Sequence, residues 1–176
     1  MNIICLDTET TGFRKDDEVL QLAICDSNGK RLFNRYFRPE NKTSWPEAEA
    51  INHISYEMVR DCKPITFYKQ EIEGLINNAD LVVGYNHESF DLKMLRQVGL
   101  ELQPKASYDV MIKFAPVFGE WNSAKNDYKW QKLGVCADYF NYKWSGNAHD
   151  AEADAKATMY CYTKMQELKK APGMER

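Results

Sequence analysis

Cysteines are few in this sequence, and their arrangement excludes two common kinds of stabilising site. The five in 176 residues are an odd number scattered along the chain: Cys5, Cys25, Cys62, Cys136 and Cys161. None forms a C-x-x-C pair, so the pattern indicates neither a disulfide framework nor a zinc site. Widely spaced free thiols are typical of a reducing compartment, and we expect a cytoplasmic protein.

Long apolar runs and repeats are also missing. No stretch approaches the roughly 18 consecutive apolar residues that a membrane-spanning helix needs, and no basic segment or cleavage site precedes the first strand. We therefore expect a soluble chain without a membrane partner. Because 44% of the residues are hydrophobic and no linker interrupts them, we expect one sizeable core and a single domain over residues 1–176.

A large excess of one charge is the third missing feature. The formal net charge is −3, from 23 Lys and Arg against 26 Asp and Glu. This balance argues against a broad basic face of the kind that holds long nucleic acids through many phosphate contacts. A small nucleic-acid site remains open, because divalent cations bound to a cluster of carboxylates would offset the local negative charge.

The apolar pattern alternates strands and helices. A strand is expected at residues 2–6, followed by two strands within 18–39 that are joined at an Asn-Gly turn. The apolar run 80–86 is typical of a strand covered on both faces, and one more strand is expected near residue 107. The expected helices cover residues 46–54, 55–61, 64–77, 89–99, 109–118, 129–140 and 150–170. This order predicts an α/β fold whose mixed central sheet combines an antiparallel N-terminal meander with parallel strands, flanked by helices.

Two acids lie where the first strand leaves the core. Residues 6–13 read LDTETTGF, and Asp7 and Glu9 are two positions apart, so on a strand their side chains share one face. An isolated Asp-x-Glu is also compatible with an ordinary solvated strand end. Because unpaired buried acids are costly, a pair inside the fold would indicate a bound cation.

Further acids occupy two other positions that suit a binding site. Asp91 follows the strand at 80–86 in GYNHESFDLKML, where open α/β sheets place their ligands. Asp154 lies in the first turns of the last expected helix in HDAEADAKAT, where it could also complement the helix dipole. His149 precedes that helix and could reach the same place from a loop, whereas His53 and His87 are expected at the surface.

Taken together, the three quoted segments resemble the exonuclease motifs of the DEDD superfamily, in the DEDDh branch defined by His-x4-Asp. The proofreading subunit of bacterial replicative DNA polymerases belongs to that branch. The resemblance is ordered and runs from residue 3 to about residue 160, with AINHISYEMV, SYDVMIKFA and KWQKL resembling the segments between the motifs. It implies a ribonuclease H-like fold and a metal-dependent 3′-to-5′ exonuclease.

The resemblance also implies a catalytic set. Two Mg²⁺ or Mn²⁺ ions would be bound by a carboxylate quartet, and a histidine would be the general base. The implied metal ligands are Asp7, Glu9, Asp91 and Asp154, and the implied base is His149.

The remaining implied contacts are to nucleic acid. The backbone around Thr8 and Thr10 would cradle the terminal nucleotide, and Phe13 would either contact its base or pack in the core. Asn86 resembles the asparagine ahead of the second motif, although it stands five residues before Asp91 where many members have four. The segment INHIS departs from the frequent His-Gly-Ile pattern, so we assign it no role.

Aromatic and basic side chains alternate between residues 118 and 144, a composition that suits stacking on single-stranded nucleic acid. The stacking candidates are those expected in loops, Trp121, Tyr128 and Trp144. Helical spacing predicts core positions for Trp130, Leu133, Ala137 and Phe140.

Three functions remain open. The first is an exonuclease acting on the 3′ ends of single-stranded or frayed nucleic acid, with DNA favoured over RNA, and the second is an enzyme that trims RNA or short oligonucleotides. The third, a catalytically silent nucleic-acid-binding or polymerase-docking module, is disfavoured because all five expected catalytic residues are present. Only residues 171–176 follow the last expected helix, so we expect any polymerase or repair partner to dock on the domain surface.

Overall fold

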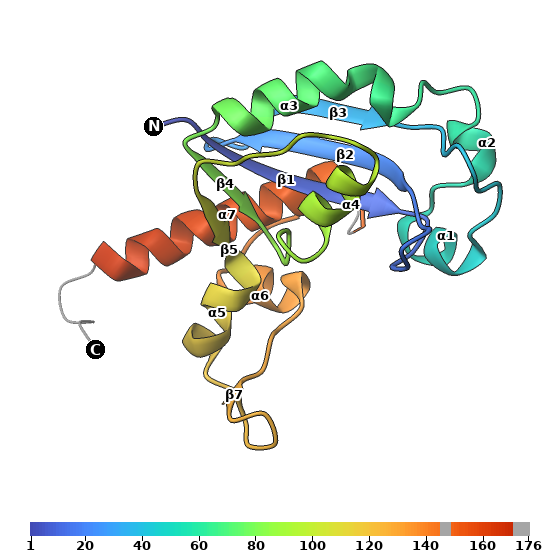
Figure 1. Ribbon diagram of the computed structural model, residues 1–176. Helices are drawn as coiled ribbons and strands as arrows, with labels where there is room; N and C mark the ends of the chain where they lie inside the picture. The colour runs from blue at the N-terminus through green and yellow to red at the C-terminus, as the bar shows by residue number, and fades with distance from the viewer. Residues whose placement is uncertain (145–148, 171–176) are drawn as a thin grey trace.

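A five-stranded mixed sheet organises the computed structural model, which describes residues 1–144 and 149–170 (Figure 1). The strands are β1 (Ile3–Thr10), β2 (Val19–Asp26), β3 (Arg31–Tyr36), β4 (Leu81–Gly84) and β5 (Ser107–Asp109), in the spatial order β3-β2-β1-β4-β5. β1, β2 and β3 pair antiparallel, whereas β4 pairs parallel with both β1 and β5. The predicted meander with a parallel extension is confirmed. The tail 171–176 lies outside the described residues.

Most of the predicted helices are present. They are α1 (Pro46–Asn52), α2 (Tyr56–Val59), the 3₁₀ helix η1 (Ile65–Tyr68), α3 (Lys69–Asn78), α4 (Asp91–Gln97), α5 (Val110–Phe118), α6 (Leu133–Tyr139) and α7 (Ala151–Lys170). Within residues 1–144 and 149–170, no helix combines the length and apolar character needed to cross a membrane.

The prediction of a helix over residues 129–140 is wrong in its first part. A short hairpin that was not predicted, β6 (Trp121–Asn122) with β7 (Asp127–Tyr128), precedes α6. The backbone N–H of Lys129 donates to the carbonyl of Glu120 at 2.8 Å, so the chain beyond β7 continues the hairpin. The helix begins only at Leu133.

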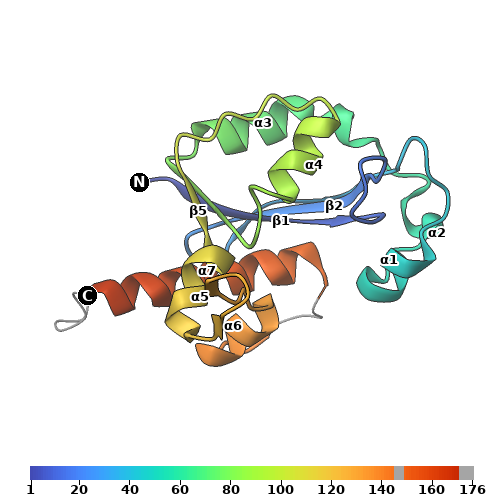
Figure 2. The ribbon, with the colours of Figure 1, turned by 60° about the horizontal axis from the view of Figure 1, so that its bottom comes forward.

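The sheet separates two apolar cores (Figure 2). α3 and α4 cover one face, where Ile4 and Leu6 of β1 pack with Ile72, and α5, α6 and α7 cover the other, where Cys5 packs with Met159. Because successive side chains of a strand point to opposite faces, the odd positions of β1 face α7. This alternation places Asp7 and Glu9, the next two odd positions after Cys5, on the side where α7 begins.

The first strand is longer than the expected 2–6. It runs to Thr10, and Glu9 still pairs with Gln21 of β2 before a register shift at Thr10. The acidic segment is therefore held by its pairing with β2 rather than hanging from a loop, whereas β4 pairs only with residues 3–5.

Buried polar contacts attach the start of α7 to the middle of the sheet. The side chain of Gln21 is almost completely buried, and its Nε2 donates to Asp150 Oδ2 at 3.1 Å. Its Oε1 accepts from the backbone N–H of Ala151 at 3.3 Å. These two bonds satisfy the buried amide and fix the backbone immediately before α7.

A second group of polar contacts between α7 and the sheet is made by Glu152, the residue after Ala151. Glu152 is buried and forms salt bridges with Arg31 and Lys156, and it accepts a hydrogen bond from Asn34 Nδ2 at 2.9 Å. Although burial opposes ionisation, these partners lower the pKa of Glu152 to about 2. Glu152 therefore stays charged and ties α7 to β3.

The prediction that His87 lies at the surface is wrong, whereas His53 is exposed as predicted. His87 is completely buried, because the connection after β4 turns its ring back under the strand. Its Nε2 is 2.7 Å from Ser107 Oγ, and a Cβ added at Gly84 would lie 2.4 Å from the Cβ of His87. A glycine in β4 thus makes the room that this histidine occupies.

We expect Gly84→Ala to lower the free energy of unfolding by about 1–3 kcal/mol, because the added methyl group has no space beside His87. Gly74→Ala is the matched control. Gly74 lies inside α3 with nothing within 4 Å of an added Cβ, so this change is expected to raise stability by about 0.5–1 kcal/mol. Denaturant unfolding measures both. Equal stability of Gly84→Ala and the wild type would contradict the packing described for His87.

Candidate active site

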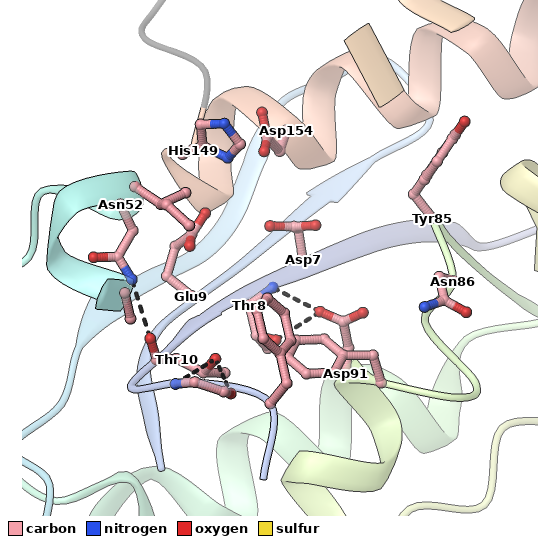
Figure 3. A pocket seen from close by; sticks show the side chains of 15 residues that line it. Asp7, Thr8, Glu9, Thr10, Asn52, Tyr85, Asn86, Asp91, His149 and Asp154 are labelled. Atoms are coloured by element: carbon pink, nitrogen blue, oxygen red, sulfur yellow. Dashed lines mark hydrogen bonds between the residues drawn. The ribbon is translucent and has the colours of Figure 1, made fainter. Parts of the chain in front are cut away.

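A cleft of about 360 Å³ opens at the end of β1, between α1, the β4–α4 connection and the start of α7 (Figure 3). Residues from all four segments line it. They are Asp7, Thr8, Glu9, Thr10, Gly12, Phe13, Ala48, Ile51, Asn52, Tyr85, Asn86, Phe90, Asp91, His149 and Asp154. The structure thus brings to one cleft every residue that the three motifs and Asn86 implied for catalysis, metal binding or nucleotide contact.

Asp91 is held in place by β1. It is the first residue of α4, and its Oδ1 accepts two hydrogen bonds from Thr8, from the backbone N–H at 2.8 Å and from Oγ1 at 2.6 Å. The N–H of Thr8 is therefore used within the chain and positions an acid rather than a nucleotide. Asp7 precedes Thr8 and faces the same cleft from β1 (Figure 3).

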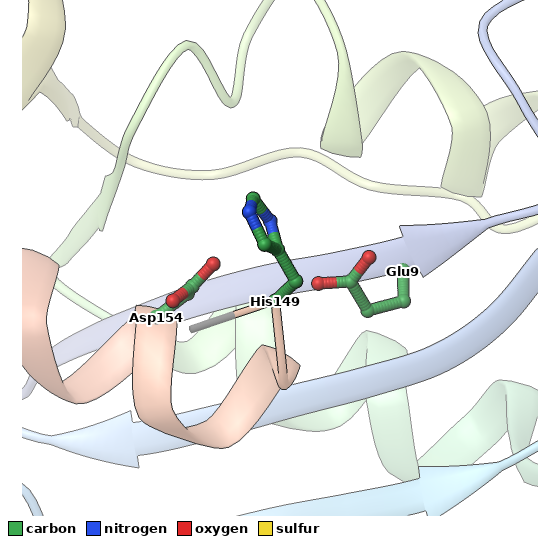
Figure 4. A group of neighbouring side chains, drawn as sticks. All are labelled: Glu9, His149 and Asp154. Carbon is green, nitrogen blue, oxygen red and sulfur yellow. The ribbon is translucent and has the colours of Figure 1, made fainter. Parts of the chain in front are cut away.

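Three further groups meet at the start of α7 (Figure 4). One donor atom each of Glu9, His149 and Asp154 lies within 4.8 Å of the others. His149 has a left-handed backbone, with φ of 66°, and it precedes α7, whereas Asp154 lies in the first turns of that helix. The loop position predicted for His149 therefore brings it to the acids.

Crowding and burial together disfavour negative charge in the cleft. Burial, reinforced by the neighbouring carboxylates, raises the pKa of Asp7 well above its usual value and that of Glu9 to about 8. Burial also raises the pKa of Asp91 to about 7, against the opposing hydrogen bonds from Thr8. The pKa of Asp154 is raised to about 6 by burial and by Asp150.

The cleft fits a divalent cation on the chemistry of its donors. Among the described residues that line it there is no Lys or Arg to offset the four carboxylates. Asp154 Oδ1 is buried and has no hydrogen-bond partner in the described part of the chain. Hard cations such as Mg²⁺ and Mn²⁺ prefer carboxylate oxygens, so Asp7, Glu9, Asp91 and Asp154 are a suitable ligand set.

One side of the cleft is apolar. Phe13 is 82% exposed, so it is not a core residue, and its ring packs against Phe90 with centroids 5.4 Å apart. Ile51 of α1 lies on the same cleft and is about half exposed. These side chains form a surface on which a planar base could rest.

Polar residues around the cleft are fixed by hydrogen bonds. Asn52 Nδ2 donates to the carbonyl of Thr10 at 3.1 Å, and Thr10 Oγ1 donates to the carbonyl of Gly12 at 2.7 Å. Asn86 adopts φ of 63° and its N–H donates to Asp109 Oδ1 at 3.1 Å, which turns its side chain toward the cleft.

Sequence reasoning missed part of this lining. Asn52 was given no role because INHIS departs from the frequent pattern, yet its side chain joins α1 to β1 at the cleft. Ile51 and Tyr85 also line the cleft, and each is adjacent in sequence to a polar lining residue, Asn52 or Asn86. That adjacency was the available signal.

The predictions for the aromatic segment are partly wrong. Trp130, expected in the core, is 62% exposed because it precedes α6, whereas Ala137 is buried as expected. Trp121 and Tyr128 pack against each other in the hairpin, with ring centroids 5.1 Å apart, and do not line the acidic cleft. Trp144 lies outside helices and strands, as predicted, but it is half-buried against Tyr142.

Comparison with known structures supports the fold. The zinc-bound form of E. coli exonuclease I in complex with single-stranded DNA superimposes with a TM-score of 0.74 at 20% sequence identity, over 96% of this chain and 41% of that chain. Exonuclease X in complex with 5′ overhanging duplex DNA gives a TM-score of 0.69 at 21% identity, over 94% of this chain and 92% of that chain. The chain thus spans about two fifths of exonuclease I, and the predicted ribonuclease H-like fold is confirmed.

Sequence comparison identifies the family. The chain is 31% identical over 166 residues to an uncharacterized exonuclease, CP81, of Escherichia phage 186, covering 89% of this chain and 84% of the phage protein. Residues 4–162 match the RNase_T family, described as exonuclease. The match includes all three motifs, and the chain therefore belongs to the RNase_T exonuclease family of the DEDD superfamily.

Proposed function

We propose that this protein is a single-domain, metal-dependent exonuclease that releases nucleotides from the 3′ end of single-stranded or frayed DNA. The observation that carries the proposal is the convergence of four carboxylates and His149 on one cleft whose described lining has no Lys or Arg. An anionic phosphodiester can enter such a cleft only if cations accompany it. The DNA complexes of the related structures support DNA as the substrate.

The proposed ligands of two Mg²⁺ or Mn²⁺ ions are Asp7, Glu9, Asp91 and Asp154. When bound, divalent cations would offset the charge of the phosphodiester and make a water molecule more acidic. The chain contributes rigid positions for the carboxylates: β1 carries two of them, and Thr8 holds a third through two hydrogen bonds to Asp91.

His149 is the proposed general base. An imidazole nitrogen would take a proton from water as its oxygen bonds to phosphorus, and the bond from phosphorus to the 3′ oxygen of the preceding nucleotide would break. The product is a nucleoside 5′-monophosphate. Glu9 and Asp154 lie beside the ring and would favour the imidazolium formed in this step.

The apolar side of the cleft is the proposed site of the terminal nucleotide. Phe13 and Ile51 would contact its base, because both are exposed there and neither is needed to fill the core. Asn86 and the carbonyl-bound Asn52 provide amide groups at the same cleft. None of these contacts reads the identity of a base, so broad sequence tolerance is expected.

Removal of a proposed ligand should abolish activity. Digestion of 5′-labelled single-stranded DNA with Mg²⁺ or Mn²⁺ is expected to give a ladder that shortens from the 3′ end, and Asp7→Asn is expected to give none. Asp61→Asn is the control, since Asp61 is exposed and remote in sequence from every motif, and it should digest like the wild type. RNA of the same sequence tests the alternative substrate. A full ladder from Asp7→Asn would contradict the ligand assignment.

Removal of the proposed base should separate turnover from metal binding. Asparagine tolerates the left-handed backbone at position 149, so any activity lost in His149→Asn is due to removal of the imidazole ring. We expect kcat to fall by about 10²–10⁴, while the rise in Tm on adding Mn²⁺ persists. His53→Asn, at the other exposed histidine with φ of 59°, is the matched control. Unchanged kcat in His149→Asn would remove it from this role.

The stability of the metal-free protein should fall as pH rises. The pKa values of Glu9, Asp91 and Asp154 are raised to about 8, 7 and 6, so the folded state binds more protons than the unfolded state from about pH 4 upward. The contribution of these groups to the free energy of unfolding is therefore fully present below about pH 4 and is lost by about pH 8. In a chelator we expect Tm to decrease between pH 5 and about pH 8, less steeply in Asp154→Asn, and Mg²⁺ to reduce the decrease. A Tm that stays constant over this interval in chelator would refute the crowding described for the four acids.

A further inference from the structure

A second groove, of about 780 Å³, continues from the acidic cleft toward α6. The two share four residues, Tyr85, Asn86, His149 and Asp154, which surround the proposed position of the scissile bond. Beyond them the groove is lined by side chains between α5 and α7, including Trp130, Lys132, Val135 and Trp144. Phe13 and Ile51 line the acidic cleft but not this groove.

Trp130 is the most exposed of the large apolar side chains described in this groove. It is 62% exposed, and within the described ranges no aromatic ring stacks on it and no cation lies over it. Its ring face is therefore open to a planar ligand in the groove. Trp144 lines the same groove but is half-buried against Tyr142, so it contributes to the wall.

The backbone that carries Trp130 is fixed close to the catalytic residues. The hydroxyl of Tyr85 donates to the carbonyl of Gln131 at 2.6 Å, and Tyr85 lines both clefts. Gln131 Nε2 donates to Glu120 Oε2 at 2.9 Å, which ties the same segment to the end of α5. The indole is therefore presented by a segment braced on both sides rather than by a free loop.

The groove also carries an unpaired cation. Lys132 forms no salt bridge with any residue in the described parts of the chain, whereas nearby Lys129 is paired with Glu120. One tryptophan face and one free ammonium group match the two features that single-stranded nucleic acid offers repeatedly, a base and a phosphate. A duplex would hide its base faces, and an acidic peptide would leave the indole uncovered.

We propose that this groove binds the nucleotides on the 5′ side of the scissile bond, with Trp130 stacking on a base and Lys132 pairing with a phosphate of the single strand. The proposal rests on the proposed function, because it takes the acidic cleft as the place of cleavage. A strand whose terminal nucleotide lies against Phe13 then continues past His149 and Asp154 into the groove. The affinity gained there depends on strand length and little on sequence.

The test compares two substrates of different length. The p-nitrophenyl ester of thymidine 5′-monophosphate fills the terminal-nucleotide site and carries only a nitrophenyl group, with no second phosphate, on the 5′ side of the scissile bond. An octathymidylate extends along the groove. For Trp130→Ala we expect KM for the octamer to rise about tenfold, with kcat and the hydrolysis of the ester unchanged within a factor of about two. Trp130→Phe keeps an aromatic face and should recover most of the loss. Lys132→Gln should also raise KM for the octamer alone.

The control is Trp121→Ala, which removes another exposed tryptophan, 51% exposed, that does not line the groove. It should leave KM for both substrates at wild-type values. Equal KM for the octamer in Trp130→Ala and Trp121→Ala, or an equal loss on both substrates in Trp130→Ala, would overturn the proposal. If the wild type hydrolyses neither substrate with Mg²⁺ or Mn²⁺, the proposed function itself fails, and that result is distinct from a failure of the groove.

Discussion

Repulsion between carboxylates that are held too close together is the constraint on which the rest of this structure depends. Burial and crowding raise the pKa of every acid in the cleft, so the site is under strain whenever it is fully ionised without a cation. Acids on flexible loops would relax this strain by moving apart. Here Asp7 and Glu9 lie on β1 within its pairing with β2, and Asp91 is bound to Thr8, so the separation is imposed.

Two acids near the start of α7 have opposite pKa shifts because they face different sides of the helix. Glu152 and Asp154 are two residues apart, about 200° around the helix axis, and therefore face different surroundings. Glu152 meets Arg31 and Lys156, and its pKa is lowered to about 2, whereas Asp154 meets other acids and its pKa is raised to about 6. The first fixes the helix to β3, and that attachment makes the strained location of the second possible.

The sequence predicted what depends on periodicity and on ordered motifs. The alternation along β1 predicted that Asp7 and Glu9 share a face, and the strand-to-helix connection predicted the place of Asp91. It could not predict the burial of His87, because that burial depends on residues of two strands. Gly84 of β4 leaves space for the ring, and Ser107 of the neighbouring β5 lies within hydrogen-bond distance of its Nε2. Contacts of this kind exist only after folding.

The prediction that Trp130 lies in the core was wrong for a related reason. Its spacing with residues of α6 fits a helix, but the hydrogen bond between Lys129 and Glu120 continues the hairpin, and the helix starts three residues later. The pairing of β6 with β7 is carried by two residues on each side, too short for an alternating pattern to be recognised. Tertiary pairing here overrode a helical pattern.

The attachment of α7 to β2 through Gln21 and Asp150 joins residues 129 positions apart in the chain. Closing so long a loop costs chain entropy, and a chain in which α7 is not docked lacks both His149 and Asp154 at the cleft. Assembly of the cleft from both ends of the chain thus couples the complete set of lining residues to the completed native state.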